Sequence, residues 1–97
     1  MELSKVAITE HVGDEGTPYQ VIKGVASVDA APHHKHERRV HLTYLLSDTE
    51  GVTVSAEVED DDVYGVAIRA MDRGKVIQVT IEEWPDHSVF LTDAYST

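Results

Sequence analysis

Clusters of turn-forming residues limit the fold of this chain more than any other feature of its sequence. Gly, Pro, Asp and Ser, the residues that tight turns favour, gather at six places. These clusters lie at residues 13–18, 29–37, 47–51, 60–62, 72–75 and 85–87. The runs between them are rich in Val, Ile, Thr and Tyr, which is typical of antiparallel strands. We therefore expect an all-β fold, a single small antiparallel β-sandwich or barrel of about seven strands.

The length of the chain predicts one β domain over residues 1–97, because 97 residues cannot build a second core. No apolar run approaches the length that spans a bilayer, so we expect no contact with a membrane. Residues 1–10 lack the basic start and apolar stretch of a signal peptide. We expect a cytoplasmic protein, or one within a particle that is assembled there.

Alternating side chains predict a hairpin around residues 47–51, since a hairpin turn fixes which residues face each other. In the predicted register Leu46 faces Val52, and every further pair on that side is apolar. These pairs are Tyr44 with Val54, Leu42 with Ala56 and Val40 with Val58. On the other side the same register gives favourable polar pairs. They are Arg39 with Glu59, His41 with Glu57 and Thr43 with Ser55.

Residues 63–71 fit two structures. A continued meander makes them a strand that pairs Ala56 with Val66 and Ile68 with Val79. Helical spacing of apolar residues supports a helix instead, with Asp62 as N-cap and Gly74 as C-cap. We favour the strand, because Gly and β-branched residues in this segment weaken a helix.

The charge of the chain restricts its partners. Eighteen Asp and Glu against eight Lys and Arg give a formal net charge of −10. Such a surface repels a phosphate backbone, so we expect no direct binding of nucleic acid. The chain has no Cys, which excludes disulfides, thiolate metal sites and Cys nucleophiles.

A histidine cluster is the strongest candidate for a metal site. His34 and His36 project to the same side of an extended chain, the spacing with which two imidazoles bind one metal ion. His41, Glu57 or His87 would supply the third ligand. We expect no cofactor, and the alternative is a divalent transition metal bound by this cluster.

The His-x-His sequence before a strand, followed by a meander and Pro85-Asp86-His87, resembles the metal motifs of the cupin family of small β-barrels. The resemblance carries over only His34, His36 and His87 as ligands. The sequence departs from the family where a Glu should follow the second His, because Val40 and His41 stand there. It also has Glu83-Trp84-Pro85 where glycines frame the second motif.

Acidic and aromatic residues form the candidate interaction surface. The densest acidic patch suits the docking of a basic protein partner. It consists of Glu57, Glu59, Asp60, Asp61 and Asp62. Trp84 and Phe90, expected to be exposed near a terminal strand, suit an interface.

The leading hypothesis is a non-enzymatic acidic module for protein–protein interaction or assembly, self-associating as a homo-oligomer. No nucleophile elbow, phosphate-binding loop or dinucleotide fingerprint is present, and nothing requires an enzyme. A metal-binding β-barrel that uses the histidine cluster is the first alternative. An acidic mimic of nucleic acid that antagonises a basic nucleic-acid-binding protein is the second.

Overall fold

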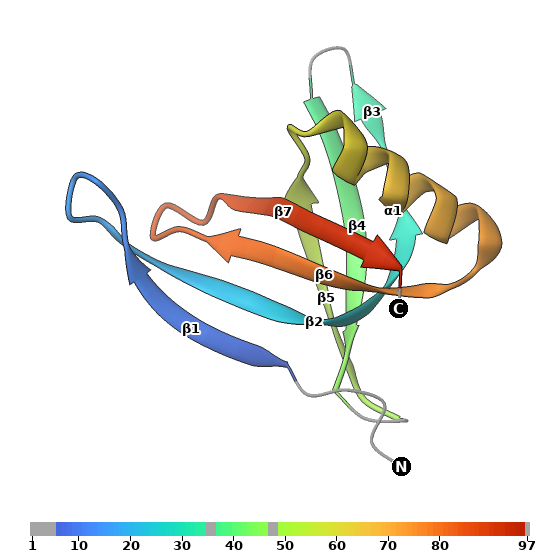
Figure 1. Cartoon of the computed structure of the whole chain (residues 1–97), viewed down its shortest axis with the longest axis horizontal. Coiled ribbons are helices and arrows are strands. Elements are labelled where there is room, and N and C mark those ends of the chain that lie inside the picture. The colour runs from blue at the N-terminus through green and yellow to red at the C-terminus, as the bar shows by residue number, and fades with distance from the viewer. Residues whose placement is uncertain (1–5, 35–36, 47–48, 97) are drawn as a thin grey trace.

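A computed structural model of the chain describes residues 6–34, 37–46 and 49–96, and it is mostly β, as the sequence predicts. The backbone forms strands and one helix in the order shown in Figure 1. The elements are β1 (Ala7–Val12), β2 (Pro18–Ala30), β3 (His33–His34), β4 (Glu37–Leu45), β5 (Gly51–Glu57), α1 (Asp61–Arg73), β6 (Val76–Glu83) and β7 (Val89–Ser96).

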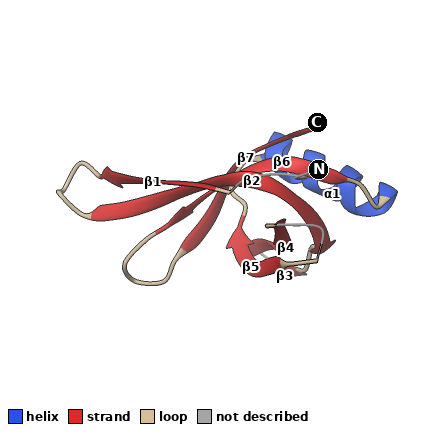
Figure 2. Ribbon diagram, turned by 90° about the horizontal axis from the view of Figure 1, so that it is seen from below, coloured by secondary structure: helices blue, strands red, loops and turns tan. Residues whose placement is uncertain are grey.

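Five strands close into a barrel in the order β2, β6, β7, β5, β4, with β4 returning to β2. Closure is possible because β2 is long enough to serve two neighbours: residues 20–27 pair with β6, and residues 26–30 pair with β4. The β5–β7 pairing is parallel and the other pairings are antiparallel. β1 adds to β2 outside the barrel, and Figure 2 shows this hairpin extending away from it.

Alternation along the strands places apolar side chains inside the barrel, as expected for half-buried strands. Val40, Leu42 and Tyr44 of β4 are buried, and they face the same interior as Val79 and Ile81 of β6. The predicted inner face of the β4–β5 hairpin is therefore confirmed away from the turn, where Ala56 and Val58 are also buried. Next to the turn it is wrong, because Leu46 and Val52 are 41% and 47% exposed.

The predicted register of that hairpin is wrong by two residues. Tyr44 pairs with Val52, Leu42 with Val54 and Val40 with Ala56, while Arg39 pairs with Glu57. The cause is a shorter turn, in which the Leu46 N–H donates to the Glu50 carbonyl at 3.0 Å. Because side chains alternate with a period of two, a shift by two keeps every residue on its predicted face.

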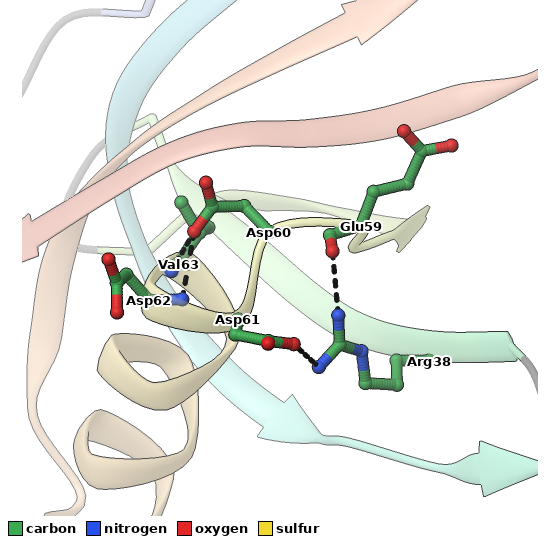
Figure 3. Close-up of polar contacts among 6 residues, drawn as sticks. All are labelled: Arg38, Glu59, Asp60, Asp61, Asp62 and Val63. Atoms are coloured by element: carbon green, nitrogen blue, oxygen red, sulfur yellow. Dashed lines mark hydrogen bonds and ion pairs between the residues drawn. The ribbon is translucent and has the colours of Figure 1, made fainter.

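The strand predicted for residues 63–71 is wrong, and the helical alternative is correct. Asp60 is the N-cap, two residues before the predicted Asp62, and its carboxylate accepts from the N–H groups of Asp62 at 2.8 Å and Val63 at 3.1 Å (Figure 3). Gly74 ends the helix in the left-handed conformation, with φ 62°. The buried side chains of α1 face the barrel and outweigh the weak helix propensity of its Gly and β-branched residues. They are Val63, Ala67 and Ala70.

Arg38 of β4 fixes the start of α1 against the barrel. Its guanidinium donates to the Asp61 carboxylate and, at 2.7 Å, to the Glu59 carbonyl (Figure 3). It also lies 5.0 Å from the centre of the Tyr64 ring, within the range of a cation–π contact.

Within the described residues, we find no helix with the length and apolar character needed to cross a bilayer.

Replacing the N-cap tests how much α1 depends on it. We expect Asp60→Ala to lower the free energy of unfolding by about 1 kcal/mol, because two helical N–H groups lose their acceptor. Asp60→Asn should retain most of the stability, since an amide oxygen accepts the same bonds. Urea denaturation followed by circular dichroism measures both, and equal losses in the two variants would contradict the capping role.

Tyr44 predicts a dependence of stability on alkaline pH. Its hydroxyl donates to the Ile22 carbonyl at 2.8 Å, and burial raises the pKa of this phenol above its usual range. Above about pH 10 the unfolded chain releases the proton while the folded chain retains it, so folding becomes less favourable as the pH rises. We expect urea midpoints for the native chain to fall more steeply above that pH than those for Tyr44→Phe. Parallel curves would show that another group causes the loss.

Candidate functional site

Three aromatic rings stack across neighbouring strands at the end of the sheet where the hairpin turns lie. The rings of His11 and Tyr19 have centroids 5.6 Å apart, and those of Tyr19 and Trp84 are 4.3 Å apart with an interplanar angle of 19°. The strand register explains the row, because His11 pairs with Tyr19 and the next residue of β2 pairs with Glu83. The stack therefore joins β1, β2 and the end of β6.

Two turns hold Trp84 in place. In the β6–β7 turn, the Trp84 N–H donates to the Ser88 carbonyl at 2.9 Å, and its own carbonyl accepts from the His87 N–H at 2.9 Å. The Asp86 carboxylate accepts from the Ser88 N–H, a bond that lowers the pKa of Asp86. In the β1–β2 turn, Gly13 leaves room for the indole, since a Cβ atom there would lie 3.2 Å from Cη2 of Trp84. The ring is thus set against both turns.

Trp84 borders three separate hollows in the surface. One, of about 280 Å³, also involves Tyr19, and another, of about 320 Å³, involves Gly13. The third is a groove of about 400 Å³ that is bounded by Phe90 and Leu91 of β7. We call this third hollow the Trp84 groove; its lining residues are Glu59, Asp60, Glu82, Trp84, Phe90, Leu91 and Thr92.

Acidic residues line all three hollows beside Trp84. Among the described residues, the linings of the hollows contain seven acidic side chains and no Lys or Arg. The acidic residues are Glu10, Asp14, Glu15, Glu59, Asp60, Glu82 and Glu83. Carboxylates of one sign at a concave surface concentrate the negative potential there, which attracts cations.

The Trp84 groove combines an apolar floor with an acidic rim. Trp84 and Phe90 supply hydrophobic surface, and Glu59 and Glu82 supply charge. Lys and Arg side chains have the matching form, an apolar stem that carries a cationic head. A guanidinium or ammonium group can also be attracted to the indole face.

The groove brings together four residues that the sequence singles out for interaction: Glu59, Asp60, Trp84 and Phe90. Glu57 lies beside them as the partner of Phe90 in the β5–β7 pairing. Asp61 and Asp62 lie in the first turn of α1, outside the lining, and Asp61 is engaged by Arg38. Trp84 and Phe90, expected to be exposed, are half-buried.

Sequence reasoning missed Glu82, Leu91 and the ring stack. Glu82 and Phe90 are cross-strand partners in the β6–β7 hairpin, so correct pairing of these two strands would have placed Glu82 in the groove. The ring stack depends on β2 lying between β1 and β6, which no local pattern indicates.

The residues predicted to bind a metal are placed on different elements. His41 is exposed on β4 opposite Ser55, and His87 lies in the β6–β7 turn. The backbone of His34 belongs to β3, opposite Glu37, and His36 lies outside the described residues. Within residues 6–34, 37–46 and 49–96, no group of three or more His, Asp or Glu side chains could hold a metal ion.

Comparisons with protein-family models, with curated proteins and with solved structures find no match for this chain. The Trp84 groove is the described surface with the most specific chemistry, because it joins a defined shape, an aromatic ring and charge of one sign.

Proposed function

We propose that this chain is a non-enzymatic interaction module that binds a basic segment of a partner protein in the Trp84 groove. The observation that carries the proposal is the pairing of an apolar floor, formed by Trp84 and Phe90, with the carboxylates of Glu59 and Glu82. A volume of about 400 Å³ is within the range of hollows that take a side chain or a small ligand.

The acidic groups of the groove differ in how free they are to meet a ligand. Asp60 is partly committed, because one of its carboxylate oxygens caps α1. The Glu59 side chain points away from Arg38, which bonds only its backbone carbonyl (Figure 3). Glu59 and Glu82 are therefore the groups we assign to the cationic head of an incoming Lys or Arg.

The barrel gives little support to direct binding of nucleic acid. Its connectivity resembles that of the OB fold, in which the second and third barrel strands often bind oligonucleotides. The corresponding strands here are β4 and β5. On β4, Arg38 bonds Asp61 and Arg39 bonds Glu37 at 2.7 Å, so both guanidinium groups already have carboxylate partners. With a net charge of −10, this favours a basic protein as the partner over a phosphate backbone.

Trp84 is the only tryptophan, so its fluorescence reports on ligands that bind beside it, and Phe90 and Glu82 variants identify those in the groove. We expect a short peptide of alternating Arg and Ala to change the emission saturably, with a dissociation constant that increases with salt. Phe90→Ala should weaken binding about ten-fold through lost apolar contact, and Glu82→Gln by about two- to five-fold through lost charge.

The matched control is Asp72→Asn, which removes one negative charge from the other end of α1. We expect it to change the affinity less than two-fold, roughly the size of a distant screened charge. A loss with Asp72→Asn as large as with Glu82→Gln would show that the peptide senses only the net charge. A peptide of alternating Glu and Ala should not bind.

Self-association through β1 is the second candidate. All six residues of β1 are exposed, and within the described residues β1 pairs only with β2, so its other edge is open. Ile8 and Val12 are 58% and 68% exposed. An open strand edge with exposed apolar side chains can pair with the same strand of a second copy.

Light scattering after size exclusion tests this candidate. We expect the native chain to elute as a dimer at high concentration and Ile8→Lys with Val12→Lys to elute as a monomer, because charge on an edge strand opposes pairing. Val52→Lys, at an exposed position on another strand, should leave the dimer intact. A native chain that is monomeric at every concentration would exclude this mode.

A further inference from the structure

A small cavity at the other end of the β6–β7 hairpin has the opposite charge. Arg69 and Arg73 of α1 and Lys75, which follows the helix, line a hollow of about 140 Å³. The remaining lining is Val66, Ala70, Val76, Ile77 and Ser96. Figure 1 shows this region, where α1 turns into β6 beside the end of β7.

These three cations have no anionic partner within the described part of the chain. Arg38 and Arg39 each bond a carboxylate, whereas no hydrogen bond or ion pair joins the side chains of Arg69, Arg73 and Lys75 to a described residue. The chain has eighteen acidic residues from which partners could be drawn. Three cations around one hollow repel one another, and that repulsion is relieved when an anion enters.

The fold fixes the cations around the hollow. Arg69 and Arg73 are four residues apart and so lie on the same side of α1. Gly74 reverses the chain, and its N–H donates to the Met71 carbonyl at 3.2 Å while the Lys75 N–H donates to the Ala70 carbonyl at 3.0 Å. This C-terminal capping motif sets Lys75 next to the last turn of the helix.

The same motif reduces the unfavourable field that an anion would meet at a helix C-terminus. Two of the carbonyl groups that carry the negative end of the dipole are already bonded. Arg73 alone could be explained as a cation that stabilises the helix end. Arg69, one turn earlier, and Lys75, beyond the cap, add charge that this explanation does not require.

We propose that this cavity binds a tetrahedral oxyanion of the phosphate type, either as the free ion or as a phosphomonoester. Arg side chains bind such groups through two parallel N–H bonds, and Lys75 adds a point charge. The hydroxyl of Ser96 is a further donor. The hollow has room for one such group, in contrast to an extended phosphate backbone.

Titration of the isotope-labelled chain with sodium phosphate, followed by amide shifts in NMR, tests the site. Sodium chloride at matched ionic strength is the reference. We expect saturable shifts that centre on Gly74, Lys75 and Ser96. Arg69→Gln combined with Arg73→Gln should weaken phosphate binding about ten-fold or more. Lys23→Gln on β2, which removes one charge as Arg69→Gln does, should weaken it less than two-fold.

Two further arms separate the sources of the oxyanion and guard against misfolding. Saturation by phosphate alone identifies the free ion, and tighter saturation by O-phosphoserine identifies a phosphorylated group on a larger molecule. Arg69→Gln alone, which leaves the last turn of α1 unchanged, should weaken binding at an unaltered urea midpoint. Shifts that do not saturate, or that persist unchanged in the double variant, would overturn the proposal. The peptide titration of the Trp84 groove is unaffected by any of these results.

Discussion

The closure of the barrel depends on β2, since this one strand hydrogen-bonds to β6 along most of its length and to β4 near its end. Without that double pairing, the strands would form an open sheet in which only the β5–β7 pairing joins the two hairpins, with one apolar side in water. Closure also leaves α1 to cover part of the core, where Val63 and Ala67 pack. Both candidate sites lie on elements that this closure brings into place.

Much of the fold could be predicted from the sequence, because alternation has a short and strict period. The inner face of β4 follows from Val40, Leu42 and Tyr44 alone. The register of the β4–β5 hairpin cannot be predicted in the same way, because it depends on the length of the turn. Turns that differ by two residues place the same side chains on each face, so the alternation does not distinguish between them. For residues 63–71 local propensity predicts a strand, but the cap at Asp60 and the burial of Ala67 and Ala70 against the barrel favour the helix.

Several residues of the candidate site could be predicted from the sequence, but their arrangement in space could not. Its acidic and aromatic members stand out in the sequence by their chemistry, and Trp84, Phe90 and Glu59 could be named from it. That these residues lie in one groove could not be predicted. Glu59 follows β5 while Phe90 belongs to β7, and α1 and β6 separate these strands in the sequence. They become neighbours only through the parallel β5–β7 pairing. The cationic cavity does not follow from a predicted strand at residues 63–71, since only the helix brings Arg69, Arg73 and Lys75 around one hollow.

The β6–β7 hairpin links surfaces of opposite sign, with Arg73 and Lys75 near its open end and Glu82 and Glu83 near its turn. Strands of eight residues separate these ends by roughly 25 Å. These side chains thus contribute a dipole along that axis in addition to the net charge. In the field of a large charged body it would experience a torque and rotate before contact, so that one end leads the approach.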